Sequence, residues 1–130
     1  MSQQHDLILY LPPATFYLAG GRITHDDGQT VWLTNSEYKL SLHLLKKALV
    51  SPNGYLPKWF LINLLYPNCE EPDDVEQAIY RFIHNLRKKL GDPTHLKTLQ
   101  GRGYQLRIPQ EGFCTASVEE VHQLIQDLMN

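Results

Sequence analysis

The stretch from Asp73 to Ile108 constrains the fold of this chain more than any other part of it. Aliphatic residues recur there at spacings of four, three and four, which is the period of one helix face. These residues are Ile79, Ile83, Leu86 and Leu90. The opposite face would carry the polar residues Arg81, His84, Asn85 and Lys88. The pattern predicts an amphipathic helix with a cationic outer face.

This helix should be followed by a β-hairpin. Gly91 can take the left-handed conformation that closes a helix, and Pro93 should prevent the helix from restarting. Two short alternating runs come next, at His95–Leu99 and Tyr104–Ile108. They flank Gln100-Gly101-Arg102-Gly103, which has the composition of a hairpin turn. The sequence therefore predicts a slim loop that carries an arginine at its tip.

A cationic helix beside such a loop suits a nucleic-acid duplex. An α-helix fits the major groove, and an arginine on a narrow loop can enter the minor groove. The whole chain has a net charge of −2, but residues 75–108 hold seven basic and two acidic residues, a local charge of +5. Attraction to phosphate is local at physiological salt, so this cluster matters more than the total. A solvated helix face that binds nothing could carry the same charge.

Length and composition narrow the class of protein. At 130 residues and 42% hydrophobic content, the chain should form one packed domain with at most a small appendage. No apolar run is long enough to span a membrane, and the N-terminus does not have the pattern of a secretory signal, so we expect a cytoplasmic protein. Cys69 and Cys114 form no metal-binding pair and should be free thiols.

Catalytic chemistry has little support in the sequence. We find no nucleophile beside a general base, no glycine-rich phosphate loop after a strand, and no metal-ligand spacing. We therefore expect neither an enzyme nor a bound cofactor or metal.

The first 66 residues should form a small antiparallel sheet and two helices. Turn residues separate four short runs with strand character: Leu7–Leu11, Phe16–Leu18, Arg22–His25 and Thr30–Leu33. Thr34 and Glu37 fit a capping box for a helix that runs to about Val50. Pro57 fits the first turn of a second, strongly apolar helix at Lys58–Tyr66.

The end of the chain should form one more helix. Ser117 and Glu120 fit a second capping box, ahead of a helix with one apolar side. That side comprises Val118, Val121, Leu124, Ile125, Leu128 and Met129. Its polar face has no basic residue, so we expect it to pack on protein and not on a membrane. We thus divide the chain into a domain at 1–108 and a linker with an amphipathic helix at 109–130.

Three ordered motifs resemble the OmpR/PhoB-type winged-helix domain, the DNA-binding half of many bacterial response regulators. The first opens a helix with Leu33, Thr34 and Glu37. The second lies near the end of the cationic helix, at Leu86, Arg87, Lys89 and Leu90. The third lies in the hairpin, at Thr98, Gly101, Gly103 and Tyr104. The resemblance covers roughly residues 14–108.

This resemblance implies an α+β winged helix-turn-helix. It would have a four-stranded N-terminal sheet, three helices and a C-terminal hairpin wing, to which this chain adds a further helix. The resemblance also implies that Arg81, Asn85 and Lys88 face the major groove, with His84 on the same helix face. Arg87 and Lys97 or Thr98 would touch phosphates, and Arg102 would reach the minor groove.

Two departures from the family pattern suggest special features. Tyr80 stands where the family has an acidic residue, so its ring could reach a base or phosphate, or simply fill the interface. The first two helices carry unusual apolar residues, namely Leu42, Leu45, Trp59 and Phe60. We expect this surface to receive the apolar face of the C-terminal helix, through Val121, Leu124, Ile125 and Leu128, within one chain or across a dimer.

The leading interpretation is a sequence-specific transcription regulator that binds double-stranded DNA without phosphorylation input. By analogy with the family we expect a homodimer on DNA. The acidic loop at 67–74 occupies the position through which the family can contact RNA polymerase, although a plain solvated loop is the better supported reading. Two alternatives remain. One is a ToxR-like regulator, which carries this domain ahead of a membrane segment. The other is an adaptor or antagonist that uses the scaffold to bind protein.

Overall fold

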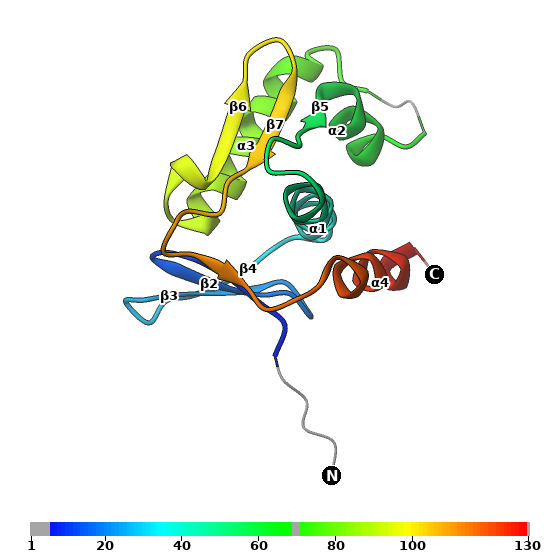
Figure 1. Cartoon of the computed structure of the whole chain (residues 1–130). Helices are drawn as coiled ribbons and strands as arrows, with labels where there is room; N and C mark the ends of the chain where they lie inside the picture. Colours follow the sequence, from blue (N-terminus) through cyan, green and yellow to red (C-terminus); the bar gives the residue numbers. More distant parts are fainter. Residues whose placement is uncertain (1–5, 69–70, 130) are drawn as a thin grey trace.

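The computed structural model describes residues 6–68 and 71–129, and it shows an α+β winged helix-turn-helix fold. Helix α1 (Asn35–Val50) runs through the middle of the molecule. The N-terminal sheet lies on one side of α1, and the helix-turn-helix and hairpin lie on the other (Figure 1). The N-terminal antiparallel sheet, the helices and the hairpin expected from the sequence are therefore confirmed.

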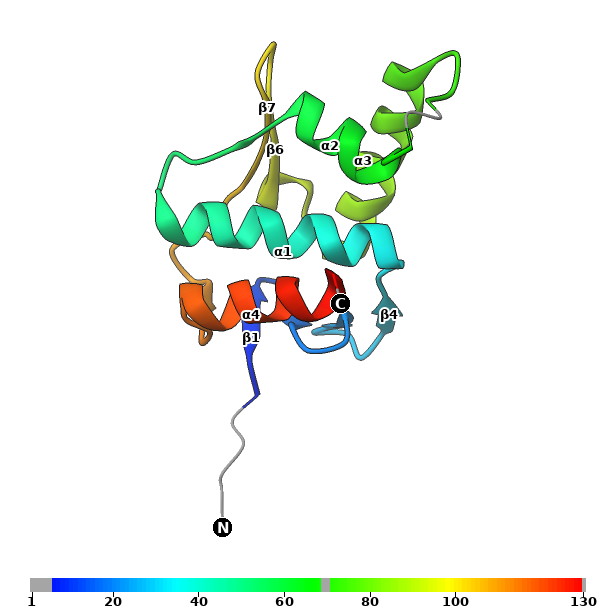
Figure 2. The same cartoon turned by 90° about the vertical axis from the view of Figure 1, so that its right-hand side faces the viewer.

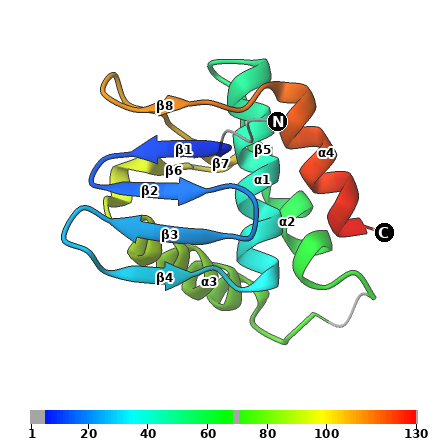
Figure 3. The same cartoon turned by 90° about the horizontal axis from the view of Figure 1, so that it is seen from below.

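The N-terminal sheet is antiparallel and consecutive through its first four strands. These are β1 (Ile8–Leu11), β2 (Ala14–Tyr17), β3 (Arg22–His25) and β4 (Thr30–Trp32). The sheet order is β4-β3-β2-β1-β8, as Figure 3 shows from below. Residues of β1 and β2 alternate between buried and half-buried, because one face packs on the core.

The expected four strands become five. A two-residue strand, β8 (Phe113–Cys114), pairs with β1 through Leu9 and Tyr10. The segment after the hairpin thus returns across the molecule and extends the N-terminal sheet. Two residues are too few to show an alternating pattern, so this strand could not be predicted from periodicity.

Helices α1 and α2 form as their end signals predict, with small shifts. The Thr34 hydroxyl accepts from the Glu37 N–H at 3.2 Å, and the Glu37 carboxylate accepts from the Thr34 N–H at 2.9 Å. Helix α2 (Lys58–Leu65) ends one residue earlier than expected. Pro57 is the N-cap of α2 and not part of its first turn, because it also closes the short strand β5 (Leu56–Pro57).

The helix and hairpin expected at residues 73–108 are α3 (Val75–Leu90) and the strands β6 (Leu96–Leu99) and β7 (Gly103–Leu106). Gly91 closes α3 with φ of 93°. The α-helix does not restart after Gly91, but a 3-10 turn (Pro93–His95) forms there, so the strand expected from His95 begins at Leu96. It forms because proline fits the first position of a turn and Asp92 accepts from the Thr94 N–H at 2.9 Å.

The wing has a third strand, because β5 pairs with β7 in the order β5-β7-β6. This pairing explains one glycine. A Cβ at Gly103 would lie 2.0 Å from the Leu56 carbonyl oxygen, so only glycine permits the two backbones to approach this closely.

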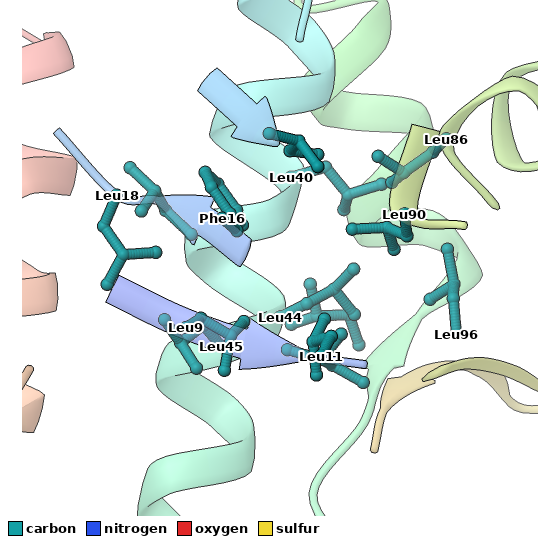
Figure 4. Packing of buried hydrophobic residues seen from close by; sticks show 14 of the residues in the cluster. Leu9, Leu11, Phe16, Leu18, Leu40, Leu44, Leu45, Leu86, Leu90 and Leu96 are labelled. Carbon is teal, nitrogen blue, oxygen red and sulfur yellow. The ribbon is translucent and has the colours of Figure 1, made fainter. Parts of the chain in front are cut away.

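The core joins the sheet, α1 and α3. Figure 4 shows Leu9, Leu11 and Phe16 from the sheet, and Leu18 just after β2, meeting Leu40, Leu44 and Leu45 from α1, with Leu86 and Leu90 from α3 beyond them. The aliphatic face expected on α3 is confirmed, since all four of its members are at most 3% exposed.

Helix α4 (Val118–Met129) packs along α1 of the same chain, antiparallel to it (Figure 2). The second capping box is present, with Glu120 N–H donating to Ser117 at 3.1 Å and Ser117 N–H donating to Glu120 at 3.0 Å. Val121 and Ile125 are buried against the core, and Lys46 of α1 lies 2.8 Å from the His122 ring. Within residues 6–68 and 71–129, none of the helices has the length and apolar character to cross a bilayer.

Candidate nucleic-acid interface

The outward face of α3 carries the side chains that the sequence singled out. Tyr80 is 64% exposed although it is a large aromatic residue. Its ring is parallel to that of His84, with an interplanar angle of 7° and centroids 6.3 Å apart. Arg81, Asn85 and Lys88 are exposed beside this pair. The face therefore combines an aromatic pair with two cations and an amide.

The cations on this face and on the wing are free to meet an anion. Arg81, Lys88, Lys97 and Arg102 are all exposed. Within the described part of the chain, the two ion pairs are Lys58–Glu76 and Lys89–Glu37, so none of these four cations is neutralised by a carboxylate. An unpaired surface cation keeps its full attraction for phosphate.

Lys89, the neighbour of Lys88, has a different role. Its ammonium donates to the Glu37 carboxylate at 2.6 Å and to the Trp32 carbonyl oxygen at 3.1 Å. The Glu37 side chain is only 5% exposed. Because the same carboxylate caps α1, this contact fixes the end of α3 to the start of α1 and removes Lys89 from the outward surface.

Arg87 connects α3 to the wing. Its Nε donates to the Leu96 carbonyl oxygen at 2.8 Å, and a terminal nitrogen donates to the Thr98 hydroxyl at 2.6 Å. Arginine has five N–H donors, so further donors remain for a phosphate. The side chain thus holds the hairpin at a fixed position relative to α3.

The wing tip and the start of α2 enclose a hollow of about 190 Å³. Lys58, Arg102 and Tyr104 line it, and Lys58 also pairs with Glu76 of α3. The pKa of the Tyr104 phenol is raised, because the effect of burial is larger than the opposing effect of the nearby cations Lys58 and Arg87. Tyr104 is therefore a neutral hydroxyl at physiological pH, beside two cationic side chains.

Lys58 was not among the residues expected at the interface. The sequence contained an indication of this role, because Lys58 follows Pro57 at the position where the OmpR/PhoB-type pattern has an arginine after a serine. The wing and α2 are far apart in sequence, so only the β5–β7 pairing brings Lys58 beside Arg102.

The hairpin and α3 lie on the side of α1 away from the N-terminal sheet, and both perpendicular views agree on this (Figures 1 and 2). The structure thus brings the predicted helix and wing residues to one side of the molecule. In the acidic loop at 67–74, Cys69 and Glu70 lie outside the described residues.

The expected docking surface for the C-terminal helix divides into two parts. Leu42 and Leu45 are fully buried, as are Val121 and Ile125, while Leu124 and Leu128 are half-buried. On α2, by contrast, Phe60 is half-buried and Trp59 is 62% exposed. Helix α4 therefore follows α1 and leaves much of the α2 surface open.

In residues 6–68 and 71–129, no group of three or more His, Cys, Asp or Glu side chains comes together in a way that could hold an ion. Cys114 is half-buried, and burial raises the pKa of its thiol. It is therefore a weak nucleophile at neutral pH.

A helix-turn-helix with a hairpin wing and an unpaired cationic surface defines a DNA-binding domain of a transcription regulator. The family model described as "Transcriptional regulatory protein, C terminal" matches residues 28–106. The chain belongs to this family, the OmpR/PhoB-type DNA-binding domains.

Curated relatives agree with this assignment. The chain is 37% identical over 109 residues to the cell cycle response regulator CtrA of Brucella ovis, a match that covers 80% of this chain and 40% of CtrA. It is 40% identical over 88 residues to CtrA of Brucella anthropi, covering 64% of this chain and 35% of that protein. The chain therefore matches less than half the length of these relatives.

Solved structures share the fold. The DNA-binding domain of CpxR from E. coli aligns with a TM-score of 0.53 and 31% identity, covering 77% of this chain and 95% of that domain. The RstA DNA-binding domain of Klebsiella pneumoniae, solved with the RstA box, has a TM-score of 0.54 and 20% identity, covering 79% and 98%. At 20% identity the second likeness supports the fold alone.

Proposed function

We propose that this chain is a sequence-specific DNA-binding regulator that inserts α3 into the major groove and the Arg102 wing into the minor groove. The observation that carries the proposal is the set of exposed, unpaired cations on α3 and the wing. The rest of the chain carries a negative net charge, so this surface is the part suited to a polyanion. The CpxR neighbour, described as a DNA-binding domain, supports the same reading.

Selection of bound duplexes from random DNA tests this function. The full chain should enrich a short consensus, and footprinting on that consensus should show protection in adjacent major and minor grooves. Recovery of duplexes without any sequence enrichment would contradict sequence-specific binding. A failure to retain DNA at low salt would contradict DNA binding altogether.

Phosphate contacts should supply most of the affinity and position the protein. Arg87 has spare N–H donors beside the wing, and Lys97 and Thr98 are exposed on β6. We assign these residues to the backbone of one strand. Arg102, which lines the hollow beside the wing and is outside the ion pairs of the described residues, would hold a phosphate or the edge of the minor groove. Lys58 lines the same hollow but is paired with Glu76, so we assign no phosphate to it.

Base contacts should come from the middle of α3. Replacing Arg81 or Asn85 with alanine should cost about 1–3 kcal/mol of binding free energy on the selected site, because arginine and asparagine can form bidentate contacts to guanine and adenine. Each variant should also relax the preferred base at one position, measured by repeating the selection. If the variant lost affinity equally on all sequences, the residue would be a phosphate contact instead.

The Tyr80–His84 pair offers an apolar surface to a thymine methyl group. Replacing one thymine of the selected site with deoxyuridine removes only that methyl, and it should weaken wild-type binding by several-fold at one position. Tyr80→Phe should keep this discrimination, whereas Tyr80→Ala should lose it. Equal binding of the thymine and uracil sites by the wild type would rule out this contact.

Arg102 should recognise a narrow minor groove. Arg102→Ala should weaken binding by about tenfold where an A·T-rich step lies beneath the wing, since such steps have a more negative minor groove. The same substitution should cost less when that step is changed to G·C. Fluorescence anisotropy on the two duplexes measures both effects, and equal losses would show that Arg102 only contacts phosphate.

Assembly and regulation are part of the proposal. We expect two copies on adjacent half-sites and binding that needs no phosphorylation. Phosphatase-treated protein should bind the selected duplex as well as untreated protein does, with two copies per full site by sedimentation.

A contact of the 67–74 loop with RNA polymerase would be tested by crosslinking from Glu71, which is exposed.

A further inference from the structure

A hollow remains beside α4 after it has packed on α1. It has a volume of about 430 Å³. Helix α1 forms its floor, and α2 and α4 form its two walls, on different sides of α1 in Figure 2. None of its described lining residues belongs to α3 or the wing, so it is separate from the surface that we propose for DNA.

The walls of the hollow are apolar. Phe60 and Leu64 line it from α2, and Ile125 and Leu128 line it from α4. Trp59 and Met129 stand at its edge and are 62% and 73% exposed. Apolar side chains that meet at a concave surface and stay open to water are typical of a ligand site.

Three aromatic rings, from His43 on α1 and from Trp59 and Phe60 on α2, contact one another at one side of the hollow. The His43 ring packs edge-on against Phe60 at a centroid distance of 5.0 Å, and Phe60 packs against Trp59 at 6.1 Å. Burial lowers the pKa of His43, and the charge of Lys46 lowers it further. His43 is therefore an uncharged part of the floor of the hollow at neutral pH.

Lys39 supplies the only formal charge among the described residues that line the hollow. Its ammonium is not in either of the ion pairs found in residues 6–68 and 71–129. No carboxylate lines the hollow in that part of the chain. A single cation at the rim of an apolar cavity favours an anionic group at one end of an apolar body.

The size of the hollow indicates a small molecule. Its volume lies within the roughly 300–1,000 Å³ that small-molecule sites occupy. Helix α2 has eight residues and is thus about 12 Å long, too short a wall to seat a partner helix of several turns. We propose that this hollow binds a small amphipathic carboxylate, with its tail between Phe60, Leu64 and Leu128 and its carboxylate on Lys39.

Trp59 provides the signal for a direct test. In a Trp32→Phe background, Trp59 is the single tryptophan, and its emission should shift when a ligand fills the hollow. The probe is sodium decanoate below its micelle concentration, compared with 1-decanol, which has the same tail without the charge. Octanoate, with two fewer methylenes, should bind about tenfold more weakly than decanoate.

The charge is tested with two matched lysine variants on α1. Lys39→Gln should weaken decanoate binding about tenfold and leave decanol binding unchanged. Lys47→Gln makes the same charge change at an exposed position that does not line the hollow, and it should change neither. Asn63→Phe, which fills the hollow from an exposed position and keeps Trp59 as the single tryptophan, should abolish both.

Several results would overturn the proposal. Wild-type protein that binds neither probe shows that the hollow is not a ligand site. Equal loss in Lys39→Gln and Lys47→Gln shows that the carboxylate is held by general charge. A Trp59 signal that depends on protein concentration, and not on decanoate, shows that a second copy of the chain covers this surface.

Discussion

Removal of residues 115–130 should lower the free energy of unfolding by about 5 kcal/mol, the largest effect we expect from any change described here. The deletion removes α4, whose Val121 and Ile125 are buried, and it uncovers the side of α1 along which α4 packs. Each such side chain contributes about 1.5–3 kcal/mol when it is buried. Urea denaturation followed by circular dichroism measures the loss, and light scattering reports any association through the uncovered side of α1.

Two point substitutions in α4, one buried and one exposed, test whether the loss of stability comes from its buried side chains. Val121→Ala should lower the free energy of unfolding by about 1–2 kcal/mol, because it removes two buried methyl groups and leaves a small cavity. Gln126→Ala, on the exposed side of α4, should change stability by less than about 0.5 kcal/mol. A truncated protein that stayed monomeric and as stable as the full chain would show that α4 contributes nothing to the fold.

Lys89→Met should destabilise the protein by about 2–3 kcal/mol. The substitution leaves the Glu37 carboxylate, 5% exposed, without the ammonium that now lies 2.6 Å away. An uncompensated buried charge is costly, although the partial exposure of Lys89 reduces the effect below that of a fully buried pair. Thermal or urea unfolding of the variant measures it.

The adjacent lysine is the matched control. Lys88→Met removes the same charge one residue earlier, where the side chain is exposed and outside the ion pairs of the described chain. It should leave stability within about 0.5 kcal/mol and weaken DNA binding instead. If the two substitutions cost the same stability, the Lys89–Glu37 pair would not have the structural role assigned to it.

Local patterns in the sequence predicted much of the fold. The aliphatic spacing on α3, the two capping boxes and the Gly-Arg-Gly tip are each set by residues within one element, and each is present. The strands β5 and β8 were not foreseen, because two residues carry no period. Their pairing partners, Tyr104 and Leu9, lie 48 and more than 100 residues away.

The distinction between Lys88 and Lys89 also required the structure. Both belong to one basic run, and the residue that neutralises Lys89 is Glu37, far away on α1. The packing of α4 was foreseen only in outline. Its apolar face was evident, but its path along α1, which leaves Trp59 exposed, depends on how α1 and α2 cross.

The central claim is that the free cations of α3 and the wing meet one duplex, and the salt dependence of DNA affinity tests it most directly. For Lys88→Gln/Arg102→Gln, the slope of log affinity against log salt should fall by about two relative to wild type. For Arg22→Gln/Lys47→Gln, which makes the same charge change on β3 and α1, the slope should stay unchanged. Equal slopes for the two double variants would contradict the claim.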